Sequence, residues 1–180
     1  METWVFGYGS LMWNPEFDPA ERALARIDGY ARTFCMRSIH HRGSPEAPGL
    51  VLALDHAPGE VCRGIALRLP EAGQADILAA LRERELVSSA YREEVVPLML
   101  DDGRAVQALA YVVDRDHVQY CGGLPLEEQA GIIAGAHGGR GPNRDYLWST
   151  VSHLIELGIR DAELEDLSAR VREITDKSLA

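Results

Sequence analysis

Cysteines, long apolar runs and basic residues are all scarce in this chain of 180 residues. The three cysteines, Cys35, Cys62 and Cys121, are widely spaced, and none belongs to a Cys-x-x-Cys pair. This odd set does not suit the disulfide framework of a small secreted protein, so we expect reduced thiols and a cytoplasmic protein. No apolar run approaches the roughly 18 residues of a membrane span. The first residues lack the basic and apolar regions of a signal peptide, so we expect neither a membrane segment nor a leader.

Basic residues are outnumbered by acidic ones. The chain has 18 Lys and Arg against 28 Asp and Glu, which gives a formal net charge of −10 at pH 7. Nucleic-acid-binding domains carry a basic face, so this balance argues against a nucleic-acid partner. Negative charge also repels anions at long range, so an anion site must be built locally from arginines and backbone N–H groups.

Strand patterns fill the first two thirds of the chain, and helical patterns fill the last third. We expect three hairpins, whose strands and turns are Ala23–Ile27 and Tyr30–Met36 around Asp28–Gly29, Leu50–Leu54 and Val61–Leu69 around Pro58–Gly59, and Tyr91–Leu100 and Ala105–Val113 around Asp101–Gly103. We expect four helices, marked by Ile77, Leu78 and Leu81, by Pro125, by Pro142, and by the stripe Leu164, Leu167, Val171 and Ile174. This order predicts an α+β protein with a mostly antiparallel sheet or barrel, in a single domain over residues 1–180.

A glycine-rich turn lies close to the start of the chain. Its residues are Val5, Phe6, Gly7, Tyr8, Gly9, Ser10 and Leu11. Valine and phenylalanine suit a strand, whereas the two glycines permit positive φ and leave the backbone uncovered. Such a turn can point several N–H groups at a small anionic or carbonyl group. A tight turn that binds nothing would have the same sequence, so both interpretations stay open.

Glu85 continues an apolar helix stripe. One i+4 step beyond Ile77 and Leu81 falls on this glutamate, whereas Glu83 lies about 200° away round the helix and should face water. A carboxyl on the core-facing line loses solvation, which raises its pKa and prepares a general base near neutral pH. If the helix ends by residue 84, Glu85 instead points outward from a loop.

Two further side chains are candidates for substrate contacts. Arg42 lies in the loop Ser38–Gly49, whose glycines and prolines could present its guanidinium to a carboxylate; a solvated surface loop is the alternative. Tyr146 lies in the first turn of an expected helix, where its hydroxyl could reach a ligand or lie at the surface of a packed ring. His40 and His41 are adjacent, but no third ligand stands at a recognisable spacing, so we expect no metal site.

Four blocks of the sequence stand in a recognisable order and spacing. They are Val5–Trp13, the loop from Ser38 through His41-Arg42-Gly43 to Pro48-Gly49, Arg84-Glu85 ahead of Tyr91, and Gly141-Pro142-Asn143 leading to Asp145-Tyr146-Leu147. With these blocks, which extend over most of the chain, the sequence resembles the ChaC-type glutathione-specific γ-glutamylcyclotransferases. The resemblance implies a small, mostly antiparallel β-barrel with flanking helices and glutathione as the substrate.

The resemblance also implies roles for particular residues. In that family the glycine turn holds the γ-glutamyl group, which implies this role for Val5–Leu11. The family's catalytic glutamate follows an arginine shortly before a tyrosine, which is Glu85 here. The tyrosine of the last block helps to bind substrate, which is Tyr146 here. Arg42, in the second block, is a further candidate for substrate binding.

This chain departs from the family pattern beside the expected base. The family commonly has a glycine between the glutamate and the following tyrosine, and Leu86–Ala90 has none. A second glutamate, Glu83, leaves the alignment ambiguous by two residues. The helix stripe favours Glu85.

The chemistry that the resemblance implies is an intramolecular cyclisation. The α-amine of the substrate attacks its own γ-carbonyl, which forms 5-oxoproline and expels cysteinylglycine, with a glutamate as general base and acid and without cofactor or metal. A glutamate at its ordinary pKa of about 4.3 is a poor base for an amine, so a desolvated Glu85 is required. The same reaction on other γ-glutamyl amines or amides, and a non-catalytic binding protein on the same fold, are alternatives. The sequence leaves the oligomeric state open.

Overall fold

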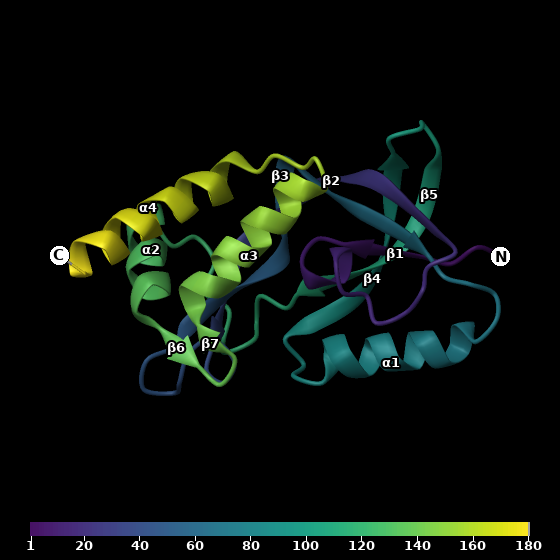
Figure 1. Ribbon diagram of the computed structural model, residues 1–180. Helices are drawn as coiled ribbons and strands as arrows, with labels where there is room; N and C mark the ends of the chain where they lie inside the picture. Colours follow the sequence, from purple (N-terminus) through teal and green to yellow (C-terminus); the bar gives the residue numbers. More distant parts are fainter. Residues whose placement is uncertain (180) are drawn as a thin grey trace. The chain divides into compact units, whose positions relative to one another are not determined.

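The computed structural model describes residues 1–179 (Figure 1). Its strands are β1 (Trp4–Gly7), β2 (Glu21–Ser38), β3 (Gly49–Arg68), β4 (Tyr91–Leu100), β5 (Ala105–Val113), β6 (His137–Gly138) and β7 (Gly141–Pro142). Its helices are the 3₁₀ segment η1 (Ser10–Met12), α1 (Gln74–Leu86), α2 (Leu126–Gly135), α3 (Asn143–Glu156) and α4 (Ala162–Ser178). The chain divides into two compact units. Unit 1 holds Met1–Thr33 and Ala53–Val118, and unit 2 holds Phe34–Leu52 and the residues from Gln119 onward.

Unit 1 is organised around a closed β-barrel with the strand order β1-β3-β2-β4-β5, in which β5 pairs back with β1. Strand β1 is antiparallel to β3, and β4 is antiparallel to both β2 and β5. Strand β5 runs parallel to β1 and, at one position, to β3. Closing a sheet in this way removes its edges, which would otherwise expose unpaired backbone groups. The predicted α+β class and the mostly antiparallel barrel with flanking helices are confirmed.

The first two predicted hairpins are wrong. Strand β2 continues through Asp28–Gly29, and β3 continues through Pro58–Gly59. Gly29 and Gly59 do adopt positive φ angles of 84° and 87°. A positive φ inside a strand bends it, as in a β-bulge, and does not have to reverse the chain. The third hairpin, β4–β5, is confirmed, and its turn contains Gly103 with a φ of 91°.

Two apolar clusters fill unit 1. The barrel interior includes Trp4, Phe6, Leu54, Leu98 and Val112. A second cluster lies against helix α1 and contains Val5, Leu11, Leu69, Leu81 and Tyr111. The alternation of β1 explains both, because successive side chains of a strand point to opposite faces. The second cluster therefore joins β1, η1 and α1, the elements that carry the glycine turn and Glu85.

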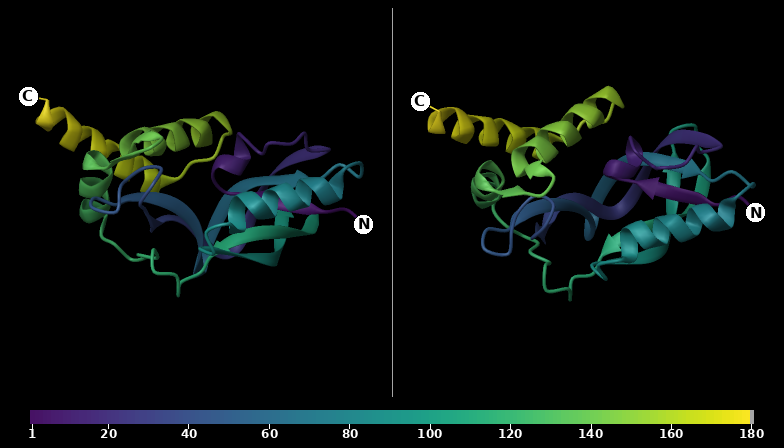
Figure 2. Two further views of the ribbon diagram at one scale, coloured as in Figure 1. Left: turned by 90° about the horizontal axis from the view of Figure 1, so that it is seen from below. Right: turned by 60° about the horizontal axis from the view of Figure 1, so that its bottom comes forward.

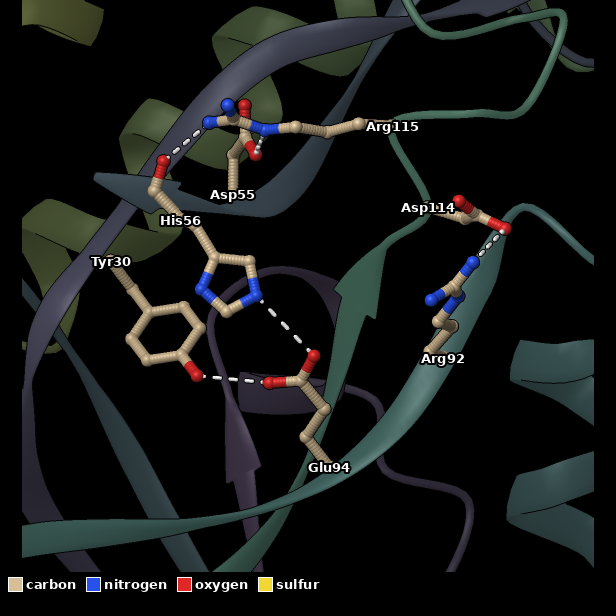
Figure 3. A network of polar contacts seen from close by, with 7 residues as sticks. All are labelled: Tyr30, Asp55, His56, Arg92, Glu94, Asp114 and Arg115. Atoms are coloured by element: carbon tan, nitrogen blue, oxygen red, sulfur yellow. Dashed lines mark hydrogen bonds and ion pairs between the residues drawn. The ribbon is translucent and has the colours of Figure 1, made fainter. Parts of the chain in front are cut away.

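A polar network lies on the barrel strands (Figure 3). The Tyr30 hydroxyl donates to Glu94 Oε2 at 2.9 Å, and His56 Nε2 lies 3.3 Å from the other oxygen of that carboxylate. Burial, followed by the hydrogen bond to Glu94, raises the pKa of Tyr30 to about 12. Arg115 donates to Asp55 Oδ1 at 2.8 Å and to the carbonyl oxygen of His56 at 2.6 Å. The network ties β2, β3, β4 and the segment after β5 together.

Unit 2 contains the three C-terminal helices, and α4 packs against both α2 and α3 (Figure 2). On α4, the predicted stripe is buried at Leu164, Leu167 and Val171. The Asp161 carboxylate caps this helix by accepting from the N–H of Leu164 at 3.1 Å. Among the helices of residues 1–179, none is long and apolar enough to cross a membrane.

Candidate active site

The glycine turn leaves the barrel at the end of β1. Asn14 N–H donates to Ser10 O at 2.7 Å, which closes the turn around η1. Gly9 is buried, whereas Ser10 is exposed. Arg32, 6% exposed, donates from Nε to the carbonyl oxygen of Tyr8. The buried guanidinium of Arg32 therefore holds the turn on its buried side, and Ser10 lies at the surface of unit 1.

Glu85 lies in the last turn of helix α1. The helix continues to Leu86, so the alternative in which it ends by residue 84 does not apply. Leu81 is buried, Glu83 is exposed, and the Glu85 side chain is 16% exposed, as the helix stripe predicts. Burial raises the pKa of the Glu85 carboxyl; the positive charge of Arg84 acts in the opposite direction, and the negative charge of Glu16 adds to the rise.

Arg84 connects Glu85 with the glycine turn. Its Nη2 donates to Ser10 Oγ at 2.7 Å, and its Nη1 donates to Asn14 O at 2.8 Å. Its Nε lies 3.3 Å from Glu85 Oε1. In the structure, two of the candidates from the sequence, the glycine turn and Glu85, thus contact the same guanidinium. Sequence reasoning used Arg84 as a marker of the motif and assigned it no contacts, although its position next to Glu85 was a usable signal.

A buried tyrosine, Tyr111, lies close enough to Glu85 to respond to its charge. Tyr111, 1% exposed, donates from its hydroxyl to Glu93 Oε2 at 3.1 Å, and Arg82 binds both oxygens of Glu93 at 2.9 and 3.0 Å. Burial, the adjacent Glu93 and the charge of Glu85 all raise the pKa of Tyr111. Tyr111 therefore stays protonated near Glu85. In the sequence it reads as one more apolar strand position, so nothing local singled it out.

Arg42 and Tyr146 come together within unit 2. The Arg42 guanidinium lies 5.6 Å from the centre of the Tyr146 ring, and its Nη1 donates to Arg140 O at 3.0 Å and to Pro142 O at 3.2 Å. The Tyr146 hydroxyl accepts from the N–H of Leu52 at 3.3 Å. Both side chains thus have structural partners within unit 2.

His40 and His41, the adjacent histidines, are both exposed. Burial and the nearby positive charges of Arg140, His40 and Arg42 lower the pKa of His41, which favours its neutral form. Within residues 1–179, no group of three or more His, Cys, Asp or Glu side chains is arranged to hold a metal ion.

The arrangement in unit 1 suits proton transfer next to an acyl group. A carboxyl with a raised pKa is a better base for an amine than a free glutamate, and a larger fraction of it is protonated near neutral pH, so it can also act as a general acid toward a leaving group. The glycine turn, linked to this carboxyl through Arg84, contains backbone N–H groups of the kind that stabilise an oxygen that gains negative charge. The two parts together are what an acyl transfer requires.

The sequence matches a known protein family and curated proteins over most of its length. A profile of the family described as ChaC-like protein matches residues 3–174. The glutathione-specific γ-glutamylcyclotransferase of Escherichia coli strain K12 is 39% identical over 171 residues, which cover 95% of this chain and 73% of the relative. γ-Glutamylcyclotransferase 2-3 of Arabidopsis thaliana is 37% identical and covers 99% of this chain, which spans 92% of that relative.

The fold comparison leads to the same group of proteins. The crystal structure of a γ-glutamyl cyclotransferase specific to glutathione from yeast matches with a TM-score of 0.84 and 25% identity, and 96% of each chain is covered. A shared fold alone leaves the family open, but here it accompanies relatives at 37% and 39% identity and a family profile over residues 3–174. On these findings, the chain belongs to the ChaC-like protein family.

Proposed function

We propose that this chain is a glutathione-specific γ-glutamylcyclotransferase, which converts glutathione to 5-oxoproline and cysteinylglycine. The observation that carries the proposal is Glu85, a largely buried carboxyl with a raised pKa that a single arginine links to the glycine turn. The names of the relatives from E. coli and yeast, both specific for glutathione, support the choice of substrate. Such a reaction needs no external nucleophile, because amine and carbonyl belong to one molecule.

Glu85 is the general base and acid in this mechanism. It accepts a proton from the α-amine, whose lone pair attacks the γ-carbonyl carbon to close the five-membered ring. Two protons leave the substrate ammonium: one is lost before attack, and Glu85 takes the other as the new C–N bond forms and a tetrahedral oxyanion appears. When this intermediate collapses, the bond to the cysteinyl nitrogen breaks and Glu85 gives its proton to that nitrogen. The departing amine then takes up one proton from solvent, which balances the proton lost before attack and leaves cysteinylglycine as an ammonium.

The remaining candidates bind and orient the substrate. Val5–Leu11 holds the γ-glutamyl group, and backbone N–H groups around Gly9 and Ser10 stabilise the oxyanion, a contribution typically worth about 10²–10³ in rate per donor. Arg42 and Tyr146 contact the substrate. Fixing one rotamer of glutathione supplies much of the acceleration, since well-oriented intramolecular attack corresponds to effective molarities of about 10⁵–10⁸ M. We also infer that residues 1–180 act as a single domain, because the family profile covers residues 3–174. The three widely spaced cysteines support a cytoplasmic location.

Product analysis tests the proposal. Purified protein incubated with glutathione should yield equal amounts of 5-oxoproline and cysteinylglycine, resolved by liquid chromatography and mass spectrometry. N-acetylated glutathione should be inert, because acetylation removes the attacking lone pair and leaves the scissile amide unchanged. Free glutamate as the product, or cleavage of the acetylated substrate, would mean that water attacks and that the mechanism is wrong. Turnover of γ-glutamyl amines at a kcat/KM equal to that of glutathione would contradict the proposed specificity.

A further inference from the structure

Arg84 reaches four oxygen atoms around the candidate active site. It donates to Ser10 Oγ at 2.7 Å and to Asn14 O at 2.8 Å, and it lies 3.3 Å from Glu85 Oε1. Its Nη1 also lies 3.4 Å from Oε2 of Glu16. The side chain is 22% exposed, so most of it is packed among these contacts. One guanidinium thus connects the last turn of α1 with the first residue of η1 and with the loop that follows η1.

We propose that Arg84 is a positioning residue for the cyclisation, which holds the glycine turn at a fixed place relative to Glu85. The inference rests on the proposed function, in which the turn binds the γ-glutamyl group and Glu85 moves the proton. Ser10 of the turn and Arg84 are 74 positions apart in the sequence. The apolar cluster of Val5, Leu11 and Leu81 packs α1 against β1 and η1, and the polar contacts of Arg84 fix the turn relative to the last turn of α1.

The geometry needs an arginine. A guanidinium carries five N–H donors in a rigid plane, so it can address Ser10, Asn14 and Glu85 from three sides at once. A lysine ammonium is a single flexible point charge and cannot reproduce these directions. Because the Ser10 hydroxyl accepts from Arg84, its own hydrogen is directed away from this guanidinium. A displacement of about 1 Å between reacting groups can cost about 10²-fold in rate.

The charge of Arg84 acts on the base as well. Three groups near Glu85 influence or respond to its charge: Arg84 on the same helix, Glu16 in the loop after η1, and Tyr111 on β5. Burial and Glu16 raise the pKa of Glu85, and Arg84 opposes both. Loss of the arginine charge therefore raises the pKa of Glu85 further. The Glu85 titration therefore reports on the charge of Arg84, whereas kcat in a variant that keeps the charge reports on its position.

Three variants separate position from charge. Arg84→Gln removes both the positive charge and the planar set of guanidinium donors. Arg84→Lys keeps the charge, and Arg92→Gln is the matched control. Arg92 lies on β4 in the same unit, is 63% exposed, and pairs with Asp114 at 3.1 Å. For each protein, kcat/KM for glutathione is measured against pH, and the Glu85 carboxyl is titrated by ¹³C NMR. The NMR titration reports on Glu85 whether or not the variant turns over substrate.

We expect Arg84→Gln to lower kcat by about 10-fold or more and to move both the acidic limb of the profile and the Glu85 titration to higher pH. Arg84→Lys should leave the titration near the wild-type position and still lower kcat, and Arg92→Gln should match the wild type. Wild-type kcat in both Arg84 variants, or an unmoved Glu85 titration in Arg84→Gln, would overturn the inference. If the wild type itself fails to turn over glutathione, the proposed function fails. The NMR titration then still decides whether the charge of Arg84 lowers the pKa of Glu85. If Arg84→Gln does not fold, the same decision falls to Arg84→Lys, whose kcat must drop.

Discussion

The Nε atom of Arg84 lies 3.3 Å from Oε1 of Glu85, and the pKa of Glu85 is nevertheless raised. Burial of the carboxyl is the largest cause and outweighs the neighbouring positive charge. The guanidinium is also shared with oxygens of Ser10, Asn14 and Glu16, so it is not a dedicated partner of one carboxylate. A buried carboxyl next to a shared guanidinium binds a proton more readily than a free glutamate does. When it is ionised, the guanidinium still provides a positive charge beside it.

Replacing the proposed base should abolish turnover. We expect Glu85→Gln to lower kcat by at least about 10²–10⁴-fold, because an amide cannot accept the proton of the amine. Ligand binding and the circular dichroism spectrum should be nearly unchanged, since the side chain keeps its size. Glu83→Gln is the matched control on the exposed face of the same helix and should keep most activity. Loss of activity in the Glu83 variant, with activity retained in Glu85→Gln, would move the base by two residues.

Glu85→Gln should also stabilise the protein at neutral pH. The pKa of Glu85 is raised in the folded state, so its contribution to stability is fully present below the unfolded value of 4.5 and is lost as the pH rises through the folded value. Glutamine has no charge to desolvate. We therefore expect Glu85→Gln to melt at a higher temperature than the wild type near pH 7 and at a similar temperature near pH 3. Calorimetry at the two pH values tests this, and an equal difference at both would refute the role of burial.

Removing the Tyr146 hydroxyl should weaken substrate binding more than folding. One lost hydrogen bond to a substrate is typically worth about 0.5–1.5 kcal/mol, so KM for Tyr146→Phe should rise about 2- to 10-fold. The variant also loses an acceptor for the Leu52 N–H, and Tyr120→Phe in the same unit controls for a general effect of removing a hydroxyl. A lower melting temperature with an unchanged KM would show that Tyr146 only packs.

Chelators and cysteine replacement should leave kcat unchanged, because neither a metal nor a thiol takes part in the proposed cyclisation. Cys35 and Cys62 are buried, and their replacement by serine places a hydroxyl in the core, which costs about 1–3 kcal/mol of stability each. Burial raises the pKa of Cys121, which favours its unreactive thiol form. Steady-state kinetics with and without EDTA, and on each serine variant, check this. Activity that EDTA removes and a divalent ion restores would overturn the metal-free mechanism.

Ser89 occupies a backbone conformation that glycine prefers. Its φ is 58°, in the left-handed region, and it lies in the segment Leu86–Ala90, where the family resemblance implies a glycine. This conformation costs an L-residue about 1–2 kcal/mol, part of which is offset because glycine loses more entropy on folding. We expect Ser89→Gly to raise the free energy of unfolding in urea by about 0.5–1 kcal/mol and to leave kcat unchanged. Ser88→Gly, at the preceding position, should lower it; equal effects of both changes would refute the explanation.

Some of this structure follows from local pattern. The apolar stripe Ile77, Leu81, Glu85 was sufficient to place a helix and to orient the carboxyl, because helical periodicity is a property of neighbouring residues. The turn Asp101–Gly103 was likewise sufficient for the β4–β5 hairpin. The order and spacing of the sequence motifs were sufficient to suggest the family, because each motif occupies a short, recognisable stretch.

Long-range pairing decided the rest. Asp28–Gly29 and Pro58–Gly59 have the composition of hairpin turns, yet β2 and β3 run through them, since barrel strands take their hydrogen bonds from partners far along the chain. No local period in the sequence reports which oxygens will surround the guanidinium of Arg84. The amino-acid sequence by itself determined the helix, the carboxyl and the glycine turn, whereas tertiary packing alone decided that Arg84 joins them, because a contact across 74 positions exists only once the chain has folded.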